Sequence, residues 1–240
     1  MQFSSQSSSY RYFDVVVAFF VAILIVSNIA SSAKIVDLGF SLFGISLAFD
    51  GGTLLFPLAY IIGDVFTEVY GFKAARRAIW TGFAALALSA LVFCILYILP
   101  PDAYWEAETG TAAYYSILGG MSSGGIVLAS LLAYLVGGFT NSMLLSKIKV
   151  LMQGRRYWIR SLGSSLAGHL LDTLVFVTVA SFAGIFPWEL FSSLVLTNVL
   201  LKIAIEILVY PVNFATVRFL KKKEGLDVYD IGVKYGLIRG

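Results

Sequence analysis

The sequence contains one cysteine, one histidine and few charged residues. Cys94 and His169 are the single members of their kind among 240 residues, and charged residues make up 13% of the chain. One cysteine excludes a disulfide framework and a thiolate metal site, and one histidine excludes a multi-histidine metal site. We therefore expect neither a metal nor a cofactor. A Walker A loop is also missing, so ATP could drive this protein only through separate subunits.

Apolar residues take the place of the missing charges. Hydrophobic residues make up 59% of the chain, and the mean hydropathy is +0.86. An ordinary soluble domain is roughly half apolar and about one quarter charged. A soluble fold of this length could not bury so much apolar surface, whereas lipid can cover it. The composition predicts an integral membrane protein and excludes a soluble enzyme.

Six stretches are apolar and long enough to cross a bilayer as helices, which takes about 20 residues. They are Asp14–Ala33, Thr53–Tyr70, Ala78–Leu99, Gly124–Leu145, Leu162–Ala183 and Ser192–Phe219. The sequence therefore predicts an all-α membrane protein with a six-helix transmembrane domain at residues 14–220. A disordered N-terminal tail is expected at residues 1–13 and a cytoplasmic C-terminal tail at residues 221–240.

Basic residues gather in the connections on one side of the predicted bundle. Clusters follow spans two, four and six, whereas the opposite connections hold Lys34 as their only basic residue beside several acids. By the positive-inside rule, this asymmetry places both termini in the cytoplasm and the protein in the cytoplasmic (inner) membrane. The net charge of +3 is thereby explained without a nucleic-acid partner, and none is expected. The clusters comprise Lys73, Arg76 and Arg77; Lys147, Lys149, Arg155, Arg156 and Arg160; and Arg218, Lys221, Lys222 and Lys223.

The connection Lys34–Gly52 is unlike the other loops. Its apolar part is too short to span a membrane, is interrupted by Gly39 and Gly44, and ends in the turn signal Asp50-Gly51-Gly52. We interpret it as a short external hairpin or a re-entrant segment between the first two spans.

A stripe of small residues runs along the fourth span. Gly125, Ala129, Ala133 and Gly137 recur at every fourth position, which lets another helix approach closely. The partner is either a helix of the same chain or a second copy, so a homodimer through this stripe is one prediction.

Ionisable residues occur inside the predicted spans, where they are expensive. Each charge near the bilayer centre costs about 2.5–3.5 kcal/mol, so these side chains must face the bundle interior or a wet cavity. Such residues are candidates for function by default. They are Asp64, Glu68, His169, Asp172, Lys202 and Glu206.

Helical spacing places these residues on shared faces and predicts a polar cavity halfway across the membrane. Asn28 adds an amide close to mid-membrane, at the depth of Asp172 and Lys202. The three faces carry Tyr60, Asp64 and Glu68 on span two; His169, Asp172 and Phe176 on span five; and Asn198, Lys202 and Glu206 on span six.

Structural interpretations of the same residues stay open. Lys202 fits a structural ion pair with Glu206 or Asp172, and Glu68 fits an interfacial position near the basic residues that follow span two. The histidine fits a hydrogen-bonded packing role. The amides that fit hydrogen bonds between helices are Asn141 and Asn198.

Three classes of membrane protein accommodate buried acids in a chain of this size. A transporter would use the polar cavity as its substrate site. An intramembrane aspartyl protease would pair Asp64 with Asp172 across a peptide. A lipid-modifying transferase would hold a metal with Asp64 and Glu68, although no second acidic cluster accompanies them.

Several short motifs in a fixed order resemble the queuosine-precursor transporter family, which consists of vitamin-uptake-like integral membrane proteins. The resemblance covers most of residues 14–220. The motifs are Ser27-Asn28; Phe56-Pro57; Gly63-Asp64-Val65, Glu68-Val69-Tyr70-Gly71 and Ala75-Arg76-Arg77; Gly168, Asp172-Thr173 and Phe176; and Lys202 with Tyr210-Pro211.

The resemblance implies a six-helix importer of 7-deazaguanines such as 7-cyano-7-deazaguanine or 7-aminomethyl-7-deazaguanine. It implies that Asn28, Asp64, Asp172 and Lys202 lie at or near the substrate, whereas the role of Glu68 is in doubt because the family varies there. A substrate-binding subunit of an ATP-driven vitamin-type importer is the alternative within transport.

The chemistry of a deazaguanine agrees with these residues. Its Watson–Crick edge offers two adjacent N–H donors to one carboxylate, for which the candidates are Asp172 and Asp64. Asn28 or Lys202 could serve its carbonyl, and an aromatic ring such as that of Phe176 could stack on its flat face. The complete set of expected substrate-binding residues is Asn28, Asp64, Asp172, Phe176, Lys202 and Glu206, with Tyr60, Glu68, Asn141, His169 and Asn198 as further candidates.

Overall fold

Helices dominate the computed structural model, which describes residues 10–42, 45–122 and 124–238. Among these residues, five helices are long and apolar enough to cross a membrane. All five overlap predicted spans, so the predicted class of helical membrane protein is confirmed. Residues 1–9 of the expected N-terminal tail lie outside the described residues. The five helices are α1 (Phe13–Ala33), α3 (Phe72–Ile98), α6 (Gly124–Leu151), α7 (Tyr157–Phe182) and α8 (Phe191–Glu224).

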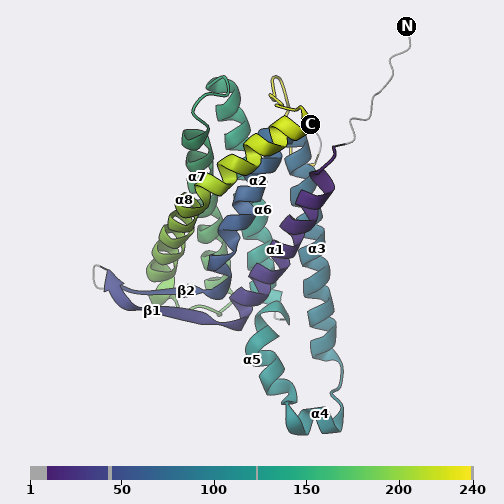
Figure 1. The fold of residues 1–240 in the computed structure, drawn as a ribbon. Helices are drawn as coiled ribbons and strands as arrows, with labels where there is room; N and C mark the ends of the chain where they lie inside the picture. The colour runs from purple at the N-terminus through teal and green to yellow at the C-terminus, as the bar shows by residue number, and fades with distance from the viewer. Residues whose placement is uncertain (1–9, 43–44, 123, 239–240) are drawn as a thin grey trace.

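The second predicted span is built from shorter pieces. The 3-10 turn η1 (Gly51–Leu54), α2 (Phe56–Val65) and the π-helix η2 (Phe66–Tyr70) follow one another and end at Gly71, whose φ is 83°. Pro57 lies in the first turn of α2, where its missing N–H breaks no helical hydrogen bond. The segment is packed against α1, α6 and α8 near the middle of the bundle (Figure 1). Because protein surrounds it, it does not need the long apolar surface of a lipid-facing helix.

The connection between α1 and η1 forms the expected hairpin. Strands β1 (Ile35–Leu42) and β2 (Ile45–Asp50) pair antiparallel, with Ile35 opposite Asp50 at the base. Gly44 lies outside the described residues. The hairpin extends across one end of the bundle, and β2 contacts α8 (Figure 1). The two strands are a small addition to a helical fold, and β2 packs against both α8 and α1 at this end.

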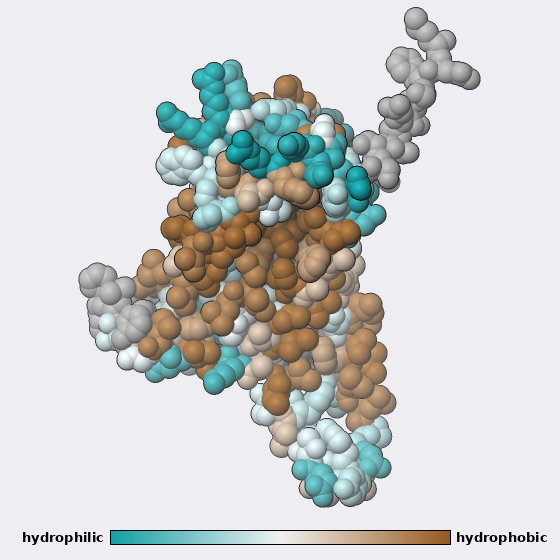
Figure 2. Space-filling view, viewed as in Figure 1, coloured by the Kyte–Doolittle hydropathy of each residue, from teal (hydrophilic) through white to brown (hydrophobic). Residues whose placement is uncertain are grey.

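Short helices fill two of the remaining connections. α4 (Ala103–Glu108) and α5 (Gly110–Ser122) join α3 to α6 and, with α3, extend beyond the hairpin (Figure 1). The side chain of Asp102 caps α4 by accepting hydrogen bonds from the N–H groups of Tyr104 (3.0 Å) and Trp105 (3.2 Å). A one-turn helix, η3 (Trp188–Leu190), leads into α8. On the face shown in Figure 2, hydrophobic residues cover most of the middle of the molecule, and hydrophilic residues gather towards its two ends.

The start of α1 and the end of α8 meet at the same end of the bundle. The carboxylate of Glu224 accepts hydrogen bonds from the N–H groups of Arg11 (2.9 Å) and Tyr12 (2.7 Å). After Gly225, residues 226–238 turn back over this end. There the carboxylate of Asp230 accepts from the N–H of Phe72 (2.8 Å) and from the hydroxyl of Ser146 (2.6 Å). We call residues 226–238 the C-terminal strap, because they tie α3 and α6 together.

The small-residue stripe of α6 packs against other helices of the same chain. Ala129 and Ala133 are 0% and 1% exposed. A side chain added at Gly137 would meet Tyr60 and the backbone carbonyl of Gly168, the latter at 3.0 Å. Other helices of the same chain thus cover the stripe at these three positions, and the homodimer through it stays a prediction.

We predict that Gly168→Ala destabilises the protein, because its new methyl group would lie 2.7 Å from Cε1 of Tyr60 and 3.0 Å from Cβ of Asn141. Overpacking of this kind costs about 1–3 kcal/mol. Gly163→Ala on the same helix is the control, since nothing lies within 4 Å of its added Cβ. Thermal unfolding in detergent should show a lower Tm for the first variant and no loss for the second. Equal Tm values would contradict the close approach of α2, α6 and α7.

Candidate functional site

The six ionisable candidates for the predicted site are all buried, and they divide into four groups along α7 and α8. None is more than 6% exposed. A single open cavity lined by all of them, as the sequence predicted, is not what the structure shows. The groups are Asp172 with Lys202, His169 with Glu206, Asp64 with Asn141 and Ser161, and Glu68 with Lys149, Arg160 and Lys221.

Asp172 and Lys202 form an ion pair between α7 and α8. Lys202 Nζ lies 2.6 Å from Asp172 Oδ2 and also donates to the hydroxyl of Thr173 at 3.1 Å. The ammonium lies 5.4 Å from the centre of the Phe56 ring. Of the two acids expected as partners of Lys202, Asp172 is the one that forms the ion pair.

Two small cavities adjoin this pair, and both are lined by Phe56 and Asp172. The central cavity also contacts Tyr60 and Asn141, and it extends towards α3. Each cavity has about 20 Å³ of free space, which is room for about one water molecule. A purine-sized ring therefore enters only if the surrounding helices separate.

The second cavity, here called the hairpin-side cavity, extends from Asp172 to the base of the β-hairpin. Asp50, Phe176 and Asn198 line it together with Lys202. The hydroxyl of Thr53 donates to Asn198 Oδ1 at 2.9 Å, and Asp50 accepts a hydrogen bond from Ser31. This cavity thus connects the ion pair to polar groups at the hairpin end.

His169 and Glu206 meet one helical turn from the ion pair. His169 Nε2 lies 3.0 Å from Glu206 Oε2. The ring of Tyr60 packs on the imidazole with 4.1 Å between ring centres, and its hydroxyl donates to the carbonyl of Gly168 at 3.3 Å. Neither residue of this pair lines the two cavities, so Tyr60 separates it from the central cavity.

Asp64 is held entirely by neutral donors. Asn141 Nδ2 donates to Oδ1 at 2.8 Å, and the Ser161 hydroxyl donates to Oδ2 at 2.5 Å. Because both carboxylate oxygens are occupied, Asp64 has less capacity to bind a ligand than Asp172. Asn141 lines the central cavity, and its amide connects Asp64 to that space.

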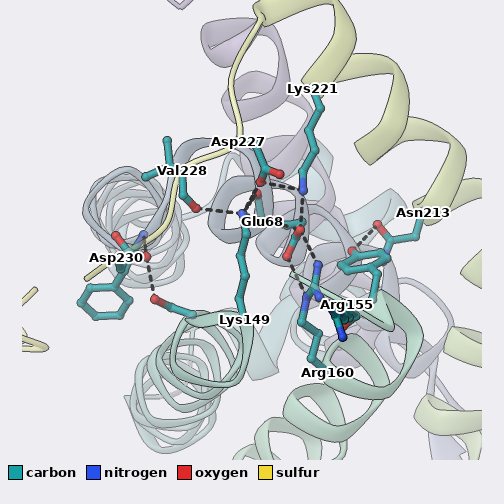
Figure 3. Close-up of polar contacts among 12 residues, drawn as sticks. Glu68, Lys149, Arg155, Arg160, Asn213, Lys221, Asp227, Val228 and Asp230 are labelled. Atoms are coloured by element: carbon teal, nitrogen blue, oxygen red, sulfur yellow. Dashed lines mark hydrogen bonds and ion pairs between the residues drawn. The ribbon is translucent and has the colours of Figure 1, made fainter. Parts of the chain in front are cut away.

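Glu68 belongs to a charged cluster at the end of the bundle that carries the C-terminal strap (Figure 3). Arg160 donates to both of its oxygens, at 2.7 and 3.1 Å, and Lys221 lies 2.5 Å from Oε1. Lys149 donates to the backbone carbonyl of Glu68 at 2.7 Å and to Asp227 at 2.5 Å. This Glu68 cluster joins η2, α6, α7, α8 and the strap, and it lies away from both cavities.

The carboxylate of Asp227 shows how strongly the cluster favours negative charge. Partial burial by itself would raise the pKa of Asp227, but hydrogen bonds from Lys149 and Lys221 hold it below the ordinary value. Asp227 is therefore charged at neutral pH and completes the pairing of the two ammonium groups.

Asn28, like Glu68, His169 and Glu206, lies outside both cavities. Its side-chain amide donates to the carbonyl of Leu24 in the preceding turn of its own helix at 2.9 Å, and it lines neither cavity. Within the described residues, no group of three or more His, Cys, Asp and Glu side chains could hold a metal ion.

Comparison with known proteins places these features in a family. A family model described as "Putative vitamin uptake transporter" matches residues 50–216, which is well over half of the chain. The chain belongs to this family. The matched region runs from Asp50 through α8 and so contains both cavities and the residues that line them beyond α1.

Curated relatives of this transporter carry consistent names. The chain is 24% identical over 232 residues to a "Probable queuosine precursor transporter" of Bacillus subtilis (strain 168), covering 91% of this chain and 98% of the relative. It is 26% identical over 180 residues to the "Queuosine precursor transporter" of Escherichia coli (strain K12), covering 75% and 73%. No solved structure matches.

These findings confirm the resemblance to the queuosine-precursor transporter family and the prediction of a multi-pass inner-membrane protein. The family consists of transporters, so the intramembrane protease and the lipid-modifying transferase are excluded as functions of this chain.

Several residues of this transporter's interior are absent from the predicted site. From the sequence, Asp50 is part of a turn signal and Arg160 belongs to a topological basic cluster. Both lie just outside predicted spans, and the helices and the hairpin fold them inward. Arg160 stands nine residues before His169, which places the two on opposite faces of α7, so helical periodicity offers no signal for Arg160. Further missed residues are Thr53, Phe56, Ser130, Lys149 and Thr173.

We predict that Glu68→Gln lowers the stability of the transporter strongly. The change leaves Arg160, Lys149 and Lys221 without their shared carboxylate, and removing one partner of a buried ion pair costs about 3–5 kcal/mol. Glu108→Gln, which changes an exposed glutamate, is the control. The readout is the Tm in detergent by a thiol-independent fluorescence assay, and a Glu68→Gln protein as stable as the control would show that the cluster contributes nothing.

Proposed function

We propose that this transporter imports a 7-deazaguanine precursor of queuosine, either 7-cyano-7-deazaguanine or 7-aminomethyl-7-deazaguanine. The names of the relatives from B. subtilis and E. coli support the class of substrate. The observation that carries the proposal for this chain is the Asp172–Lys202 ion pair, whose carboxylate adjoins both interior cavities.

Asp172 suits the Watson–Crick edge of a deazaguanine better than Asp64 does. A carboxylate accepts the two adjacent N–H donors of that edge at once, and Lys202 can move to the adjacent carbonyl of the ring. The rings of Phe56 and Phe176 flank the same space and offer flat apolar faces. In this arrangement the ion pair is exchanged for two contacts with the substrate, so no charge is left without a partner.

The route through the membrane follows the polar groups along α7 and α8. We propose that substrate enters past Asp50 and Asn198 at the hairpin end and reaches the Asp172–Lys202 pair. The Glu68 cluster then closes the opposite end of the path until the helices rearrange. Because each cavity has about 20 Å³ of free space, the structure described here corresponds to a closed state.

We propose six spans, with α2 and η2 together forming the second, and both chain ends in the cytoplasm. The contact of Glu224 with the start of α1 supports placing both ends on one side. The basic clusters around Arg76, Arg155 and Lys222 lie at that end of the bundle, which supports the cytoplasm as its location.

We predict that Asp172→Asn reduces uptake to the level of empty vesicles, because an amide cannot accept both N–H groups and still pair with Lys202. The assay is uptake of radiolabelled 7-cyano-7-deazaguanine into proteoliposomes. Guanine should compete and adenine should not, since adenine lacks the N–H next to the exocyclic amine. Asp14→Asn, which changes an exposed aspartate of α1, is the control and should transport normally.

A double variant separates recognition from stability. Asp172→Asn alone leaves the buried Lys202 ammonium unpaired, whereas Asp172→Asn combined with Lys202→Met leaves a neutral interior. The double variant should regain thermal stability without regaining uptake. Normal uptake by either variant would overturn the proposed site, and co-purification with an ATPase pair would favour the ATP-driven subunit instead.

A further inference from the structure

A second acid–base pair lies one helical turn from the proposed substrate site. His169 precedes Asp172 by three residues on α7, and Glu206 follows Lys202 by four residues on α8. Residues with these spacings lie on the same face of a helix. The α7–α8 interface thus carries two pairs in adjacent turns, and any movement of α7 against α8 changes both.

The charges of the two pairs are not equivalent. The carboxylate of Asp172 is balanced by the ammonium of Lys202 at 2.6 Å. Glu206 has only His169 as a basic partner, at 3.0 Å, and an imidazole is mostly uncharged at neutral pH. One added proton makes the second pair neutral overall, either as imidazolium with carboxylate or as imidazole with carboxylic acid. Burial away from water favours this protonated form, because a lone charge is unfavourable inside a bilayer.

The pair also has unused hydrogen-bonding capacity. Within the part of the chain that the structure describes, His169 Nδ1 and Glu206 Oε1 are buried and have no hydrogen-bond partner. One hydrogen bond joins the residues, and one polar atom on each side of it is free to receive or release a proton. The ionisable and polar groups that face the pair are Tyr60 and Asp64 on α2, Ser165 and Asp172 on α7, and Lys202 on α8.

We propose that His169 and Glu206 form a proton-binding site, and that one proton enters the cell with each substrate molecule. The proton comes from the external side and forms an N–H or O–H bond within the pair. That bond breaks when the site opens to the cytoplasm, and the proton passes to water there. The inference rests on the proposed import function and names the proton as the ion that drives import.

Tyr60 provides the physical connection between the two sites. Its ring lines the central cavity on one side and packs on His169 on the other. A substrate ring bound to Asp172 that extends into the central cavity needs room that the lining of this cavity, Tyr60 included, has to yield, because the free space there fits only about one water molecule. Displacement exposes the imidazole, so occupation of the substrate site and exchange of the proton are coupled.

The test uses wild-type protein in proteoliposomes that contain a pH-sensitive dye. Addition of 7-cyano-7-deazaguanine, which is uncharged at neutral pH, should acidify the lumen by about one proton for each molecule taken up. An acidic external medium should raise accumulation several-fold over equal pH. Uptake without lumen acidification and without a response to the gradient would overturn the proposal. Failure of any labelled substrate to enter or exchange would instead overturn the import function itself.

Variants assign the proton to this pair. Glu206→Gln keeps the size of the side chain but cannot titrate, so the ratio of uptake with a pH gradient to uptake without one should fall to one. His169→Gln should lower the same ratio. Glu189→Gln, which changes an exposed glutamate just before α8, should keep the wild-type ratio. A wild-type ratio in Glu206→Gln would contradict the assignment, and if that variant fails to fold, the dye measurement on wild-type protein still decides whether protons move.

Discussion

Pairing of buried charge inside a low-dielectric bundle constrains this structure more than any other interaction. Lipid offers no water to an ionised side chain, so each one must find its partner on a neighbouring helix. α7 supplies partners along its length: Arg160 for Glu68, Ser161 for Asp64, His169 for Glu206 and Asp172 for Lys202. The rotation of α7 and its register against α2 and α8 follow from satisfying these contacts together.

The pairs are arranged as layers along the bundle axis, and the layers differ in strength. At the end with the C-terminal strap, Glu68 is held by several cations and joins several helices. Towards the hairpin, Asp172 has one cation and two adjoining cavities. A strongly connected layer resists separation, whereas a single ion pair next to free space can exchange its partner for a ligand. This difference in the number of ionic contacts gives a physical reason for a transporter that binds its substrate in the middle of the bundle and is closed at the end with the Glu68 cluster.

Close helix packing makes the layers possible. Gly137 and Gly168 let α6 and α7 approach closely, so that a Cβ added at Gly137 would lie 3.0 Å from the backbone carbonyl oxygen of Gly168. The side chain of Tyr60 packs against both glycines. The resulting interior is dense enough that each of the two cavities has room for only about one water molecule. Density excludes water and strengthens each buried interaction, but it also means that transport requires movement of whole helices rather than of a few side chains.

The sequence by itself determined the membrane environment, the helical class and the list of ionisable residues that need partners, because these follow from composition and from the length of apolar runs. It also indicated the family, since the motifs around Asp64 and Asp172 stand in a fixed order. Only the tertiary structure decided which acid meets which base. Glu68 joined a cluster at the bundle end, Asn28 bonded within its own helix, and Asp50 was drawn to the cavity from a predicted loop. Helical periodicity specifies a face of one helix, but partner choice depends on the rotation and register of two helices, and those are set by packing across the whole bundle.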